Sequence, residues 1–191
     1  SGVLPGVYAT YNAVDPATVV PSTTSYSSAG ANSGLVGRSV VYVIRSTNNG
    51  QAWSSPISVD PAGGRGHQYF SDIDALGGKL VAVWQDNRTD DAYSVQLQRF
   101  RADGSPDGGE SQVNSWSTGH QGAAGVAADG QGNFLVVWDS NGPDGATWGI
   151  FGQRFDAFGV PAGSEFQVNS YTTGAQSGGH VAMDGGGGFV V

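Results

Sequence analysis

The sequence Gln112-Val113-Asn114-Ser115 occurs again about 55 residues later, as Gln167-Val168-Asn169-Ser170. A second segment repeats at the same distance, because Gln98-Arg99-Phe100 returns as Gln153-Arg154-Phe155. Repetition at a fixed period of this size indicates that the chain is built from copies of one structural unit. The period therefore constrains the fold class more strongly than any single residue does.

The unit that spans residues 119–170 contains four segments with the apolar pattern of β-strands. These segments are Gly125–Ala128, Asn133–Trp138, Trp148–Phe155 and Glu165–Asn169. The second segment is apolar almost throughout, which is typical of a strand buried on both faces, and the third and fourth alternate. Turns rich in Gly, Asp and Pro separate the four segments. Four antiparallel strands followed by a new copy are typical of a β-propeller blade.

The same pattern divides the rest of the chain. Residues 1–59 hold part of an earlier blade, and residues 174–191 hold half of a later one. Residues 66–115 hold a second blade, with strands predicted at residues 71–75, 79–84, 92–100 and 110–114. We therefore predict an all-β fold, a partial β-propeller with four-stranded antiparallel blades of about 54 residues. Residues 21–33 are rich in Ser, Thr and Gly and predict a loop.

The last predicted blade breaks off within its second strand. An unpaired strand edge inside a propeller leaves backbone N–H and C=O groups without partners, which is costly. We therefore expect either a fragment of a longer propeller or self-association with a second chain that closes the ring.

Composition restricts the classes of partner. The chain has 191 residues, 32 of them Gly, and a formal net charge of −8. An acidic surface repels phosphate groups, which argues against nucleic acid and against an anionic membrane surface. No apolar run approaches the roughly 20 residues of a membrane-spanning helix. The chain contains no Cys, so disulfides and thiolate chemistry are excluded.

Residues 46–53 match the pattern Ser-x-Asp-x-Gly-x-x-Trp, with Ser46, Gly50 and Trp53 in place and Asn48 instead of the Asp. In such a turn the Ser and Asx side chains bond the backbone, the Gly supplies a positive φ, and the Trp packs under the turn. The segment resembles the Asp-box, or BNR repeat, of sialidases and other secreted propellers. The resemblance implies a propeller blade and not a sialidase site, because the box lies away from the catalytic centre in that family.

A second resemblance covers the last 90 or so residues. Residues 152–156, 165–174 and 181–184 are similar to tandem repeats of large bacterial secreted and surface proteins. That resemblance implies a secreted or cell-surface location for this chain, and it implies no particular activity.

Sialidase activity would require, by the first resemblance, an Arg triad, a Tyr nucleophile with a Glu base, and an Asp acid. Arg99 and Arg154 occupy equivalent repeat positions, and so do Glu110 and Glu165. Residues that recur in each blade are better explained by structure than by catalysis. The sequence therefore argues against a sialidase, since a shared fold does not carry a shared function.

The densest polar and aromatic cluster is Arg65-Gly66-His67-Gln68-Tyr69. Arg65, His67 and Tyr69 are the candidate catalytic residues, because His and Tyr transfer protons and some propeller polysaccharide lyases use such a pair with an Arg. However, the motif recurs as Gly119-His120-Gln121 and Gly174-Ala175-Gln176. Recurrence favours a structural role in the loop that leads into each blade. A ring of these loops would also give a candidate ligand-binding set: His67, Gln68, His120, Gln121 and Gln176.

A further cluster follows the second strand of the 119–170 unit. Asp139, Asn141 and Asp144 offer oxygen ligands for Ca²⁺, although their spacing misses the EF-hand register by one residue. The alternative is a solvated acidic loop. Trp116, Trp148 and Tyr171 are candidates for stacking on sugars, and burial between blades is their alternative fate.

Together these observations favour a secreted, non-catalytic binding or scaffold module, with a glycan or cell-surface polysaccharide as the expected ligand by resemblance. They require no cofactor except the optional Ca²⁺. Two alternatives stay open. One is a fragment of a propeller glycoside hydrolase or polysaccharide lyase, and the other is a purely structural repeat of a large adhesin.

Overall fold

The computed structural model describes residues 7–14, 39–46, 51–59, 67–76, 79–87, 92–142 and 147–191. Within these ranges the chain forms thirteen β-strands and no helix. A search of the same residues finds no helix long and apolar enough to cross a membrane. The loop predicted at residues 21–33 lies outside the described residues.

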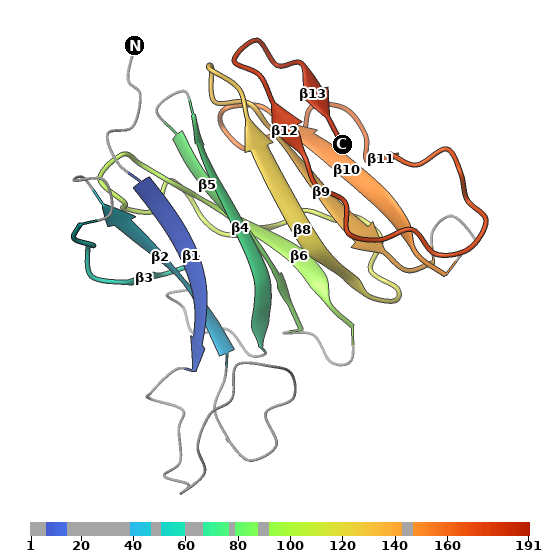
Figure 1. Cartoon of the computed structure of the whole chain (residues 1–191), viewed down its shortest axis with the longest axis horizontal. Helices are drawn as coiled ribbons and strands as arrows, with labels where there is room; N and C mark the ends of the chain where they lie inside the picture. The colour runs from blue at the N-terminus through green and yellow to red at the C-terminus, as the bar shows by residue number, and fades with distance from the viewer. Residues whose placement is uncertain are drawn as a thin grey trace, which may run out of the picture.

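The strands form four antiparallel sheets that succeed one another along the chain (Figure 1). The first blade contains β1 (Val7–Val14), β2 (Ser39–Ser46) and β3 (Ile57–Ser58). The second contains β4 (Gln68–Leu76), β5 (Lys79–Asp86), β6 (Ser94–Phe100) and β7 (Ser111–Gln112). The third contains β8 (Gln121–Ala128), β9 (Phe134–Ser140), β10 (Gly149–Phe155) and β11 (Phe166–Gln167). The fourth contains β12 (Ala182–Met183) and β13 (Phe189–Val190).

Each sheet keeps its strands in sequence order, as the blade pattern predicted. The first strand of the second blade, β4, contacts β1 on one side and β8 on the other, so neighbouring blades pack face to face. The prediction of an all-β partial propeller with four-stranded antiparallel blades is confirmed.

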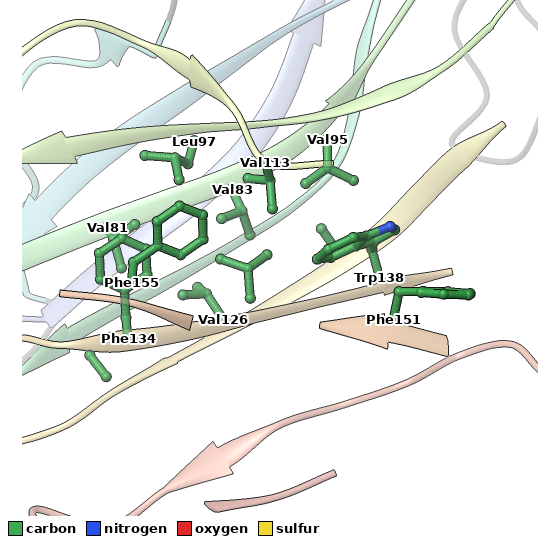
Figure 2. Packing of buried hydrophobic residues seen from close by; sticks show 13 residues of the cluster. Val81, Val83, Val95, Leu97, Val113, Val126, Phe134, Trp138, Phe151 and Phe155 are labelled. Atoms are coloured by element: carbon green, nitrogen blue, oxygen red, sulfur yellow. The ribbon is translucent and has the colours of Figure 1, made fainter. Parts of the chain in front are cut away.

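Burial on both faces of the second strand holds the blades together. Leu80, Ala82 and Trp84 on β5 belong to the apolar cluster shared with the first blade. Val81 and Val83, on the opposite face of β5, belong to the cluster shared with the third blade (Figure 2). A strand with both faces buried must be apolar at every position, which explains the continuous hydrophobic run in the sequence.

The repeated Asn of the Gln-Val-Asn-Ser motif links one blade to the next. Asn114 Oδ1 accepts a hydrogen bond from the backbone N–H of Val95 on β6, 2.8 Å away. Asn114 Nδ2 donates to Gln121 Oε1 at the start of β8, 3.2 Å away. Asn169 repeats the arrangement with the N–H of Ile150 and with Gln176 Oε1. The recurrence of the motif is therefore explained by side chains that join the third strand to the following blade.

The Asp-box segment differs from its expected packing. Ser46 is buried, but Trp53 is 43% exposed instead of packed under the turn. The N–H and Oγ of Ser54 both pair with the backbone of Arg45, and residues 51–56 are exposed along this stretch. Asn48 and Gly50 lie outside the described residues.

Candidate functional site

One end of the second and third blades holds a pocket of about 370 Å³. Strands β4 and β8 begin at this end, β5 and β9 finish there, and β6 and β10 start from it again. The pocket is lined by Phe70, Gln85, Tyr93, His120, Gln121, Gly122, Ala123, Asp139 and Trp148. Its volume is that of a site for a small ligand, and aromatic and amide side chains dominate its walls.

Two β-bulges contribute residues to the wall of the pocket. The register of β4 against β5 shifts between Tyr69 and Asp72, and that of β8 against β9 shifts between Gly122 and Gly125. Bulges redirect a strand and re-aim its side chains, and they are frequent beside functional sites.

Each bulge carries a residue with positive φ. Phe70 has φ 46° and Ala123 has φ 49°, and no other non-glycine residue of the described chain lies in that region. Both stand two residues after the repeated Gln, which is Gln68 in one blade and Gln121 in the next. Gly178 stands two residues after Gln176 and has φ 78°. The fold therefore imposes the left-handed backbone at this position in three successive blades.

In the third and fourth blades, a side chain from the preceding blade holds the backbone at this position. Gln85 Oε1, at the end of β5, accepts a hydrogen bond from the N–H of Ala123, 3.2 Å away. Asp139, at the equivalent place on β9, accepts from the N–H of Gly178 at 2.9 and 3.0 Å. It also accepts from Gly179 at 3.5 Å. The bulge is thus fixed by a polar contact between blades, and the same two side chains line the pocket.

The position of Asp139 between two blades shifts the pKa of its carboxyl group. Burial raises the pKa of the Asp139 carboxyl above its usual value, while the bonds from Gly178 and Gly179 and the charge of His180 act in the opposite direction. Asp139 is therefore a desolvated carboxyl that the backbone of the next blade stabilises.

Four aromatic rings form a row across this end of the molecule. His67 stacks on Tyr69 with ring centroids 5.8 Å apart, and Tyr69 meets Tyr93 edge to face at 6.2 Å. Tyr93 then meets His120 at 5.2 Å. The last two rings also line the pocket, so the row leads from the second blade into it.

The predicted polar set divides into two kinds of position. Gln68 and Gln121 are buried and bond within the chain, Gln68 Oε1 with the N–H of Val41 and Gln121 with Asn114. Gln176 bonds Asn169 in the same way. His67 and His120, by contrast, lie in the aromatic row. Arg65, the third candidate catalytic residue beside His67 and Tyr69, lies outside the described residues.

The structure describes Asp139 and Asn141 of the predicted Ca²⁺ set. The Asp139 carboxylate bonds the Gly178 and Gly179 N–H groups, and the backbone N–H of Asn141 donates to the carbonyl of His120. Asp144 lies outside the described residues. In the part of the chain that the structure describes, no group of three His, Cys, Asp or Glu side chains is placed to hold a metal ion.

Sequence reasoning did not select Phe70, Gln85 or Tyr93. Tyr93 belongs to a segment predicted as strand and Gln85 directly follows another, and nothing in their pattern shows which way their side chains face. Phe70 had a signal in the repeat itself, because the two later blades carry Ala123 and Gly178 at its position. Aligning the repeats therefore shows one aromatic side chain at a position where the other two blades have none, and this difference could have identified Phe70.

No protein-family model and no curated protein sequence matches this chain. Among solved structures, it is similar to the Penicillium chrysogenum α-L-arabinanase complexed with arabinobiose, with 18% identity over 78% of this chain and 46% of that chain and a TM-score of 0.56. A protein of unknown function from Dyadobacter fermentans gives a TM-score of 0.61 with 12% identity over 95% of this chain and 44% of that one. A thermostable family-43 glycoside hydrolase gives 0.54 with 13% identity over 96% and 59%.

These similarities concern the fold. The chain spans about half the length of the structures that it matches. Two of the three are named as an arabinanase and a glycoside hydrolase, and at this sequence identity the likeness shows the propeller fold alone.

Proposed function

We propose that this chain is a secreted, non-catalytic propeller module that binds carbohydrate in the pocket between its second and third blades. The observation that carries the proposal is the convergence of Tyr93, His120 and Trp148 with the amide of Gln85 around one cavity. Aromatic rings stack on the apolar faces of sugars, and amide groups bond their hydroxyls. The arabinobiose complex of the similar Penicillium arabinanase supports a sugar as the ligand class.

The chemistry of the pocket supports binding without cleavage. Most glycoside hydrolases use two carboxyl groups that flank the scissile bond. Among the described lining residues, Asp139 is the one carboxylate, and both of its oxygens bond the Gly178 N–H. A carboxylate fixed in this way serves the bulge of the next blade.

An enzyme is the second candidate, and the stacked His67 and Tyr69 favour it. Such a pair is suited to proton transfer, and it stands at the same end of the blades as the pocket. In this case the chain would be part of a glycoside hydrolase or a polysaccharide lyase.

A glycan array and turnover assays on the full-length protein test the two candidates together. Binding without product formation is the result expected here. Cleavage that is lost in His67→Ala and in Tyr69→Phe would overturn the non-catalytic proposal. Absence of both binding and cleavage would favour a structural repeat of an adhesin.

A further inference from the structure

Resting on the proposed function, we infer that Phe70 is the residue that selects the ligand. Its ring is an exposed platform at the pocket that stacks on the apolar face of an uncharged sugar. The inference comes from the backbone of Phe70, from its exposure, and from the residues at the same position in the other blades.

Neither the backbone nor the core explains a Phe at position 70. Its φ of 46° is one that bulky L-residues avoid, because the Cβ crowds the following carbonyl. Burial does not compensate, since 66% of Phe70 is exposed. A residue that is unfavourable in the backbone and also leaves an apolar ring in water is a candidate for contact with a ligand.

The other blades show that the position does not require an aromatic ring. Ala123 and Gly178 adopt the same left-handed conformation with a methyl group and with no side chain. Ala123 and Phe70 both line the pocket, so the side chain at this position of each bulge borders the cavity. The bulge therefore directs this side chain to the pocket, and the residue placed there is free to vary for recognition.

The surroundings of Phe70 define the class of ligand. The ring lines the same pocket as Tyr93, Trp148 and the Gln85 amide. No Lys or Arg lines the pocket among the described residues, whereas Asp139 does, and the whole chain carries a net charge of −8. Among the described lining residues an acidic sugar would meet no Lys or Arg, and the net negative charge gives an unfavourable field, so uncharged sugars are the class that fits.

The test measures affinity and thermal stability of the full-length protein side by side. The probes are neutral oligosaccharides, among them arabinobiose, and an acidic one, sialyllactose. Phe70→Gly and Phe70→Asn both suit a positive φ, so the melting temperature should stay unchanged or rise. The affinity for the neutral probe that binds best should fall at least about tenfold. Phe70→Trp should keep the affinity.

Phe158→Ala is the matched control. Phe158 is an exposed Phe as well, but it lies in the turn between β10 and β11, at the opposite end of the blade from Trp148. Its substitution should leave the affinity unchanged.

The outcomes separate this inference from the proposed function. If the wild-type protein binds none of the probes, the proposed function fails and this inference fails with it. If the wild type binds but Phe70→Gly binds equally well, only the role of Phe70 is overturned. A lower melting temperature accompanying the loss of binding would identify Phe70 as a structural residue, and equal affinity for sialyllactose would contradict the selection of uncharged sugars.

Discussion

Asn114 joins three segments through a single buried amide. Its Oδ1 accepts from Val95 N–H on β6, and its Nδ2 donates to Gln121 Oε1 and to the carbonyl of Trp116. A buried polar group that loses its partner costs more than the hydrogen bond contributes. The repeated Asn is therefore a main determinant of how one blade attaches to the next.

Substitution Asn114→Ala should lower the free energy of unfolding by about 2–4 kcal/mol, because it leaves the Val95 N–H and the Gln121 carbonyl without this partner. Urea denaturation measures the change. Gln131→Ala is the control, since Gln131 is exposed and uses only its backbone N–H in the turn. A loss smaller than that of the control would contradict the linking role of Asn114.

Asp139 gives a pH dependence of known sign. Its folded pKa is raised by burial, so its contribution to stability is fully present below the unfolded pKa near 3.9 and is lost as pH rises through the folded value. Asp139→Asn removes this titration and keeps an oxygen acceptor for the Gly178 N–H. The stability of Asp139→Asn relative to wild type should therefore increase as pH rises from about 4 toward 7.

Denaturation midpoints measured across that pH range for both proteins check the sign. A relative stability that falls with rising pH would show that the ionised carboxylate is favoured in the folded state. That result would contradict the conclusion that burial raises the pKa of the Asp139 carboxyl.

At the scale of elements, the second strands of the second and third blades are the most fully buried. Trp84 on β5 and Trp138 on β9 are both fully buried between blades. Trp53, in contrast, is 43% exposed despite its place in the Asp-box pattern. The same residue type thus occupies two very different environments in one chain.

We expect Trp138→Ala to destabilise the protein by about 3–5 kcal/mol, through lost burial and the cavity left between the second and third blades. Trp53→Ala, the matched control, should cost less than about 1 kcal/mol. Chemical denaturation of both variants distinguishes them. Equal losses would mean that the Asp-box Trp is packed as its motif predicted.

Most strands could be predicted from the sequence, because burial between blades gives each of them a recognisable apolar pattern. The predicted strand at residues 133–138 corresponds to β9, and that at residues 79–84 to β5. The first strands were predicted too short, since Gln121-Gly122-Ala123 is polar or small and forms a bulge instead of a regular ladder. Pattern reasoning detects periodicity, and a bulge interrupts it.

The candidate site was predicted only in part for a related reason. His67, Tyr69 and His120 were selected by residue type, and they do lie together at one end of the blades. Gln85 pairs with Tyr69 across β4 and β5, and Tyr93 directly precedes β6 of the same blade. Both reach His120 and Trp148 of the third blade only through the packing of two blades. Contacts of this kind depend on tertiary structure, which the spacing within one repeat does not encode.

At the scale of the whole molecule, we propose that ligand binds at the end of the second and third blades where β4 and β8 begin. Trp116 and Tyr171, the exposed aromatic residues that follow the Asn motif, line no part of the pocket. They are the alternative surface for sugar stacking. The pocket and this second surface both present Tyr and Trp side chains, so composition does not distinguish them. Substituting one aromatic residue on each surface does.

The most direct measurement is calorimetric titration of the full-length wild type, Tyr93→Ala and Trp116→Ala with the neutral oligosaccharide that binds best on the array. We predict that Tyr93→Ala weakens binding about tenfold or more, and that Trp116→Ala leaves it unchanged. Wild-type affinity in Tyr93→Ala, with binding lost in Trp116→Ala, would contradict the assignment of the pocket as the carbohydrate site.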